Sequence, residues 1–99
     1  MNKYSLLLLL SLISGLTQAA DPAVEALYNK SCIACHSSGA AGAPRTGDVA
    51  QWQPRMEKGM DTLVASVVNG LNAMPAKGMC YQCSNEDFKA LIDYMVAPK

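Results

Sequence analysis

The segment CIACH, residues 32–36, constrains this chain more than any other feature, because it contains the only histidine in the 99 residues. Two thiols three positions apart, followed at once by an imidazole, form the Cys-x-x-Cys-His pattern of covalent haem attachment. In that arrangement Cys32 and Cys35 each bond to one haem vinyl group, and His36 lies beneath the iron as its proximal ligand. The motif therefore predicts one haem c, attached through Cys32 and Cys35.

Residues 1–20 have the layout of a secretory signal peptide. A charged start with Lys3 precedes an apolar run of about a dozen residues, and small residues lead up to Ala19 and Ala20. The run is too short to span a bilayer comfortably. We predict cleavage after Ala19 or Ala20, which leaves residues 21–99 as a single domain in an oxidising compartment. An uncleaved membrane anchor is the alternative.

The small size of the mature chain limits how much core it can bury, and its nearly balanced charge argues against some classes of partner. About 79 residues bury little hydrophobic core, so a chain of this size usually needs a disulfide, a metal or a cofactor to hold it. Without the leader, seven basic and eight acidic side chains give a net charge near −1. This balance argues against nucleic acid or an anionic membrane surface as a partner.

Hydrophobic periodicity and capping residues predict an all-α fold with about four helices and no strand pattern. The expected helices span residues 22–32, 49–58, 62–69 and 85–97. Asp21, Asp48 and Asp61 are the expected N-caps of the first three helices, and Ser84 with Asp87 resembles a capping box at the fourth. The glycine-containing segments 37–47 and 71–83 are expected to be irregular loops.

A second Cys-x-x-Cys pair, Cys80 and Cys83, has no histidine after it. A thioredoxin-like redox pair would need a βαβ context, and a four-cysteine zinc site usually has about 15–20 residues between its two pairs. Here 44 residues separate Cys35 from Cys80. Structural disulfides among all four cysteines would leave His36 unexplained. We therefore expect a Cys80–Cys83 disulfide, with a redox-active pair as the alternative.

The single histidine excludes bis-histidine ligation within a monomer, so the sixth ligand is expected to be a methionine. Five methionines remain after the leader is removed. Three of them are assigned to packing by their positions in or beside helices: Met56, Met60 and Met95. Between Met74 and Met79, both in the second loop, we favour Met74. Pro75 biases the residue before it toward an extended backbone, which lets the Met74 side chain project from the loop.

The segments CIACHSSGAAGAPRTGD, WQPR and NGLNAMPAKGMCYQCSNEDFKALIDYM together resemble the cytochrome c5 family, and the resemblance covers nearly all of the mature chain. It implies the compact cytochrome c fold in residues 21–99, with about four helices around one covalently bound haem and the first and last helices crossing. It also implies a disulfide at the late cysteine pair and one-electron transfer in the periplasm.

The same resemblance implies roles for single residues. His36 and Met74 match the axial ligands, and Pro44 matches the loop proline whose carbonyl accepts the imidazole N–H. Trp52 and Arg55 match the W-x-P-R segment and are expected near the haem propionates. Family members often have AMPPKG where this chain has AMPAKG. The missing second proline leaves the loop less constrained and leaves the assignment of Met74 unchanged.

The sequence thus favours an electron carrier rather than an enzyme, because two filled axial positions leave no open iron site for a substrate. The expected partners are redox proteins, a respiratory donor and an acceptor such as a terminal oxidase or reductase, with no small-molecule substrate. We expect a monomer or a weak dimer, which a partner approaches over the small residues that follow His36. A haem-based ligand sensor with a displaceable Met74 is the alternative, and a peroxidase ranks last because no distal histidine is available.

Overall fold

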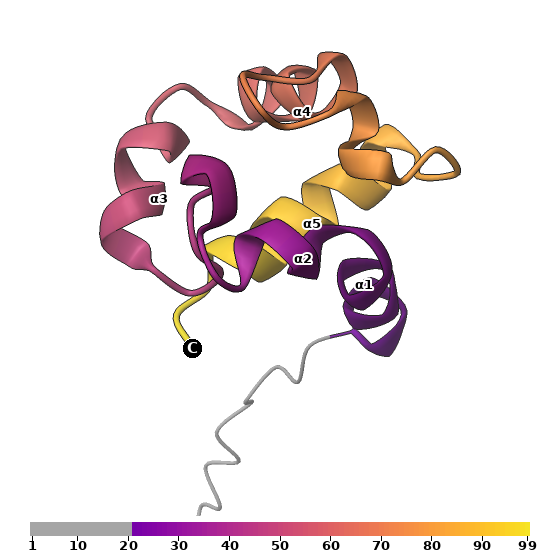
Figure 1. Ribbon diagram of the computed structural model, residues 1–99, viewed down its shortest axis with the longest axis horizontal. Helices are drawn as coiled ribbons and strands as arrows, with labels where there is room; N and C mark the ends of the chain where they lie inside the picture. Colours follow the sequence, from indigo (N-terminus) through magenta and orange to yellow (C-terminus); the bar gives the residue numbers. More distant parts are fainter. Residues whose placement is uncertain (1–20) are drawn as a thin grey trace, which may run out of the picture.

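The computed structural model describes residues 21–99, and within that range it is helical, with irregular loops and no β-strand (Figure 1). Its helical elements are α1 (Pro22–Leu27), the π-helical segment η1 (Tyr28–Cys32), α2 (Ile33–His36), α3 (Val49–Met56), α4 (Met60–Asn69) and α5 (Asn85–Val96). Short 3₁₀ turns occupy Ala40–Gly42 (η2) and Ala76–Met79 (η3). Because α1, η1 and α2 run on from one another, they form one rod. The all-α prediction of about four helices is confirmed.

The predicted signal peptide, residues 1–20, lies outside the described residues. Within residues 21–99, none of the helices has the length and apolar character needed to cross a membrane.

The first rod is longer than the sequence predicted. The helix was expected to end at Cys32, but helical backbone continues through His36, and Gly39 with φ of 78° follows it. Neither glycine nor proline occurs between Ala23 and Ser38, so nothing in this stretch stops a helix. The amide of Ile33 donates to the carbonyl of Tyr28, five residues back, which is the wide turn of a π-helix. The two thiols and the imidazole therefore lie at the end of one continuous rod.

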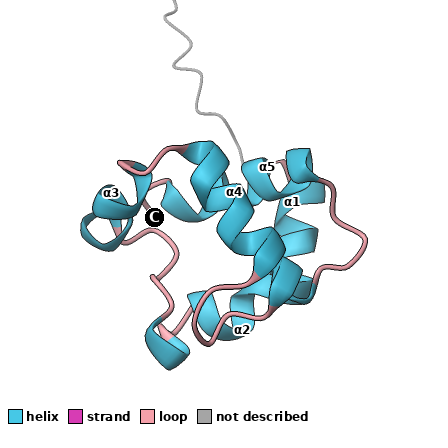
Figure 2. Cartoon of the chain, turned by 90° about the horizontal axis from the view of Figure 1, so that it is seen from above, coloured by secondary structure: helices cyan, strands magenta, loops and turns pink. Residues whose placement is uncertain are grey.

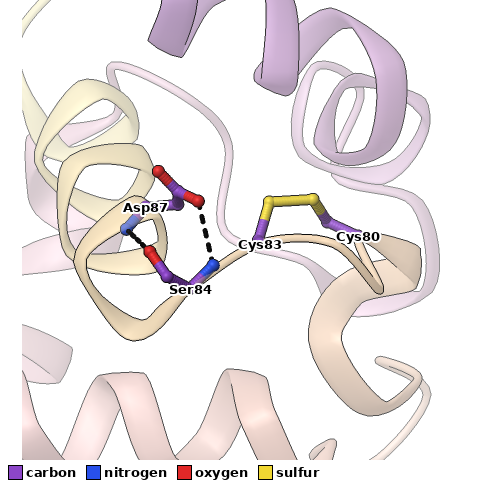
Figure 3. Close-up of a disulfide and its surroundings, with 4 residues drawn as sticks. All are labelled: Cys80, Cys83, Ser84 and Asp87. Atoms are coloured by element: carbon purple, nitrogen blue, oxygen red, sulfur yellow. Dashed lines mark hydrogen bonds between the residues drawn. A yellow bond between two sulfur atoms is a disulfide. The ribbon is translucent and has the colours of Figure 1, made fainter.

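Helix starts follow the predicted caps with one exception. The side chains of Asp21 and Asp48 accept hydrogen bonds from backbone amides of α1 and α3, at 2.9 and 3.1 Å. Ser84 and Asp87 form a reciprocal capping box at α5, drawn as dashed lines in Figure 3. The assignment of Asp61 as a cap is wrong, because α4 already begins at Met60 after Gly59. Asp61 instead lies in the first turn, where a carboxylate still favours the helix dipole.

The core is built on α5, which packs against both α1 and α4 (Figures 1 and 2). Its buried face consists of Phe88, Leu91, Ile92 and Met95. Tyr28 of η1 and Tyr94 of α5 contact each other with ring centroids 4.9 Å apart. This contact joins the first rod to α5 four residues before Cys32. The packing roles predicted for the helical methionines are confirmed, because Met95 is buried and Met56 and Met60 pack against the core.

Candidate haem site

A cavity of about 220 Å³ lies between α2 and the loops at residues 40–44 and 71–79. It brings together most of the residues predicted from the sequence. Those that line it are Cys32, Cys35, His36, Pro44, Arg55 and Met74. Trp52 is not among the lining residues. The lining is mainly apolar, and in the described chain Arg55 is its only permanently charged side chain.

His36 is held with one ring nitrogen occupied. Its Nδ1 lies 2.7 Å from the carbonyl oxygen of Pro44, and since a carbonyl can only accept, Nδ1–H is the donor. The side chain is 93% buried, and Nε2 makes no hydrogen bond to any described residue. The backbone carbonyl of His36 accepts from the amide of Thr46 at 2.7 Å. Tautomer and ring orientation are therefore set so that Nε2 carries the lone pair a metal needs.

The four cysteines divide as the sequence predicted. Cys80 and Cys83 form a disulfide, while Cys32 and Cys35 are free. Burial raises the pKa of the Cys32 thiol. The two free thiols and the imidazole of His36 reach one apolar cavity, so the donor set fits a covalent haem c.

The disulfide lies between the second cavity loop and α5, directly before the capping box (Figure 3). Cys80 is 1% exposed and Cys83 is 8% exposed, so both sulfurs belong to the core. A buried disulfide is poorly accessible to an attacking thiolate, which favours a structural role over the redox-active alternative.

Replacing both Cys80 and Cys83 by alanine should lower the free energy of unfolding by about 2 kcal/mol, the value expected for a loop this short. Guanidinium unfolding of the haem-loaded protein, followed by far-ultraviolet circular dichroism, measures this change. The folded variant should keep the visible spectrum of the unmutated haem-loaded protein, and with it the same ligands on the iron. Loss of that ligation without loss of stability would mean that the disulfide acts on the ligand loop rather than on the fold.

Met74 lies at the end of a tight turn that the sequence did not reveal. The amide of Leu71 donates to the carbonyl of Met74 at 3.1 Å, and the amide of Met74 donates back at 2.9 Å. Asn72, the first residue inside the turn, has φ of 53°, a conformation that asparagine tolerates better than most residues. Two reciprocal hydrogen bonds therefore fix the backbone from which Met74 enters the cavity.

Gly70 lets this turn fold back on the end of α4. A Cβ at Gly70 would lie 3.0 Å from both the carbonyl oxygen of Met74 and the amide nitrogen of Ala76. Few Cβ atoms lie that close to backbone atoms, so a side chain here would require the turn to move by a few tenths of an ångström.

Met79 differs from Met74 in its surroundings. It also lines the cavity, but it is 61% exposed and follows two residues with left-handed backbone, Lys77 and Gly78. Met79 itself has φ of 65°. A side chain that is mostly in solvent on a strained turn is a poorer choice for an iron ligand than one held by a hydrogen-bonded turn.

Trp52 and Arg55 were expected to act together near the propionates, but they occupy different positions. Arg55 lines the cavity. Trp52 is 5% exposed and lies beside His36, with the two rings 23° from parallel and their centroids 5.9 Å apart. Its indole Nε1–H donates to the carbonyl of Arg45 at 2.8 Å. Direct contact of either residue with the haem stays a prediction.

Comparison with known proteins agrees with this arrangement. The family model described as cytochrome c oxidase, cbb3-type, subunit III matches residues 19–95. Cytochrome c5 of Ectopseudomonas mendocina is 43% identical over 68 residues, which are 67% of this chain and 78% of that protein. The chain belongs to the cytochrome c5 family. It is therefore a monohaem c-type cytochrome, an electron carrier rather than an enzyme.

Solved structures show the same fold. A mono-haem ferrocytochrome c from Shewanella putrefaciens is 55% identical, with a TM-score of 0.69 over 77% of this chain and 94% of that one. A cytochrome c crystallised in an electron-transfer complex with nitrite reductase is 40% identical, with a TM-score of 0.70 over 79% of this chain and 95% of that one. The expected cytochrome c fold is confirmed by these neighbours.

Proposed function

We propose that this cytochrome is a one-electron carrier of a periplasmic respiratory chain, with its haem attached to Cys32 and Cys35 and its iron ligated by His36 and Met74. The observation that carries the proposal is the convergence of an imidazole with a free Nε2 and a thioether on one cavity that also holds both free thiols. When bound, the haem supplies the chemistry by cycling its iron between the ferrous and ferric states.

The protein's own residues set the properties of that site. The Pro44 carbonyl holds the proton on Nδ1, which keeps the neutral His36 ring in the tautomer that ligates through Nε2. A thioether from Met74 favours the reduced iron and so raises the potential. The mainly apolar lining of the cavity suits a haem, whose faces are apolar. Together these features suit an iron centre that changes charge without binding or releasing a ligand.

The rim of the cavity suits a redox protein partner. Leu71 and Met79 on the second loop line the cavity and are exposed apolar side chains, at 53% and 61%. No carboxylate lines the cavity in the described part of the chain. We propose that a respiratory donor and an acceptor, a terminal oxidase or a reductase, dock on this rim. The related cytochrome in complex with nitrite reductase supports such a partner, and interfaces of this class are small and weak.

The periplasmic location rests on the leader-like layout of residues 1–20 and on membership of the cytochrome c5 family. Export also accounts for a disulfide at Cys80 and Cys83, since disulfides persist in oxidising compartments.

The visible spectrum of the haem-loaded protein, oxidised and then reduced, tests the proposal. We expect a low-spin c-type spectrum with a ferric sulfur-to-iron band, and no change when carbon monoxide is added to the reduced protein. Retention of the haem under denaturing extraction checks the thioether bonds to Cys32 and Cys35. A high-spin spectrum, or ready binding of carbon monoxide, would contradict the carrier and support the displaceable Met74 of a ligand sensor.

A further inference from the structure

The loop that holds His36 is itself held by two neighbouring residues of α3. This loop, residues 44–47, contacts His36 twice, through the carbonyl of Pro44 and through the amide of Thr46. The remaining polar groups between those two contacts are the amide and the carbonyl of Arg45. Both are paired with side chains from the first turns of α3, at Gln51 and Trp52. The carbonyl also accepts from the amide of Asp48, the N-cap of α3, at 3.1 Å.

The first peptide plane joins Pro44 to Arg45. Its carbonyl oxygen accepts from His36 Nδ1 at 2.7 Å, and its amide, on the opposite edge, donates to Gln51 Oε1 at 2.8 Å. A trans peptide is planar and rigid, so its carbonyl and amide cannot turn independently; the described chain has no cis peptide. Gln51 therefore fixes the direction in which the Pro44 carbonyl points.

The second plane joins Arg45 to Thr46 and repeats the arrangement. Its amide donates to the main-chain carbonyl of His36 at 2.7 Å, and its carbonyl accepts from Trp52 Nε1–H at 2.8 Å. The indole ring also stacks beside the imidazole, with centroids 5.9 Å apart. Two consecutive planes thus each have one edge on His36 and the other edge on α3.

We propose that Gln51 and Trp52 are positioning residues for the proximal ligand: they hold the far edges of the two peptide planes whose near edges orient His36. Gln51 acts through the Pro44 carbonyl and Trp52 through the main chain of His36. Weakening the Gln51 contact frees the Pro44 carbonyl to turn, and weakening the Trp52 contact lets the main chain of His36 shift relative to that carbonyl. Either change loosens the Nδ1–H hydrogen bond and lowers the electron donation of the imidazole to the iron. The reduction potential then rises, because the ferric state loses more stabilisation than the ferrous state. The inference rests on His36 being an iron ligand, as proposed above.

The test uses the haem-loaded protein with Gln51→Met, which keeps the length of the side chain and removes the acceptor. Proton NMR of the ferrous form follows the His36 Nδ1 proton. Its exchange with water should become about three- to tenfold faster, the range expected for loss of one neutral hydrogen bond, and the potential should rise. Trp52→Phe should act in the same direction while it retains an aromatic ring beside the imidazole.

Gln53→Met is the matched control, because Gln53 is an exposed glutamine of the same helix whose side chain makes no hydrogen bond in the described structure. It should leave the Nδ1 proton and the potential unchanged. Gln51 is itself exposed, so its variant should fold even if Trp52→Phe lowers stability. If Gln51→Met matches Gln53→Met in proton exchange and potential, the inference is overturned, whatever its effect on unfolding.

The same spectrum separates this inference from the proposed function. A ferrous iron ligated by Met74 shifts the methyl signal of that methionine far upfield through the ring current of the haem. Absence of the upfield methyl in the unmutated protein would contradict the proposed ligation. Its presence, with an unmoved Nδ1 proton in Gln51→Met, would overturn the positioning role alone.

Discussion

Replacing Met74 by alanine should remove the sulfur-to-iron band of the ferric protein and convert the iron to a form that binds carbon monoxide when reduced. The backbone of Met74 is fixed by two hydrogen bonds and its side chain lines the cavity, which is why we expect it to supply the sixth ligand. Loss of the thioether should lower the reduction potential by a sizeable part of the roughly 0.8 V range that axial ligands control. Optical spectra and a potentiometric titration measure both effects.

Met79→Ala is the matched control for this prediction, since Met79 lines the same cavity but is 61% exposed. Its spectrum should keep the sulfur-to-iron band, and its potential should shift far less than that of Met74→Ala. The reverse result, with the band lost only in Met79→Ala, would mean that Met79 is the ligand and that our proposal of Met74 is wrong. Loss of the band in both single variants would mean that the loop, rather than one side chain, supports ligation.

The haem site was predictable where its chemistry is contiguous in sequence. CIACH places two thiols and an imidazole within five residues, so the motif needs no knowledge of the fold. The prediction of Met74 rested on the local effect of Pro75 and on the positions of three other methionines in or beside helices, and it stays a prediction. Pro44, eight residues after His36, came from the family resemblance, because a backbone carbonyl leaves no mark in the sequence.

The contacts that hold the loop beside His36 could not be predicted from the sequence. The two peptide planes at Arg45 are held by side chains six and seven residues away, and their pairing depends on how α3 lies against the loop. Trp52 was expected near the haem because it matches the W-x-P-R segment of the family, and its place beside His36 was not predicted. A buried indole has many possible acceptors, and sequence spacing alone does not choose among them.

Helix boundaries show the same division between local and tertiary causes. Caps at Asp21, Asp48 and Ser84 are local hydrogen bonds and were predicted correctly. The extension of the first rod through α2 to His36 was missed, although no glycine or proline interrupts the sequence there. The π-helical turn of η1 was not predicted either, and its Tyr28 contacts Tyr94 of α5. Helix α4 begins at Met60, directly after Gly59, rather than after the predicted cap Asp61.

Gly70→Ala should disturb the iron ligation without touching either ligand. Gly70 has φ and ψ of 83° and 154°, a region almost restricted to glycine, where another residue costs of order 1–3 kcal/mol. Beyond that strain, the new Cβ would lie 3.0 Å from the Met74 carbonyl oxygen, so the turn at Met74 must shift by a few tenths of an ångström relative to α4. We expect a weakened sulfur-to-iron band and measurable carbon monoxide binding by the reduced protein, both read from optical spectra.

Gly59→Ala separates the crowding from the backbone strain. Gly59 has nearly the same conformation, with φ and ψ of 88° and 151°, but an added Cβ there meets no atom within 4 Å. Both variants should therefore lose similar stability from backbone strain in a guanidinium titration, while only Gly70→Ala changes the ligation of iron. Equal spectra for the two variants would show that the turn at Met74 adapts to the added Cβ. In that case the position of the thioether would depend on the haem and not on the close approach of α4.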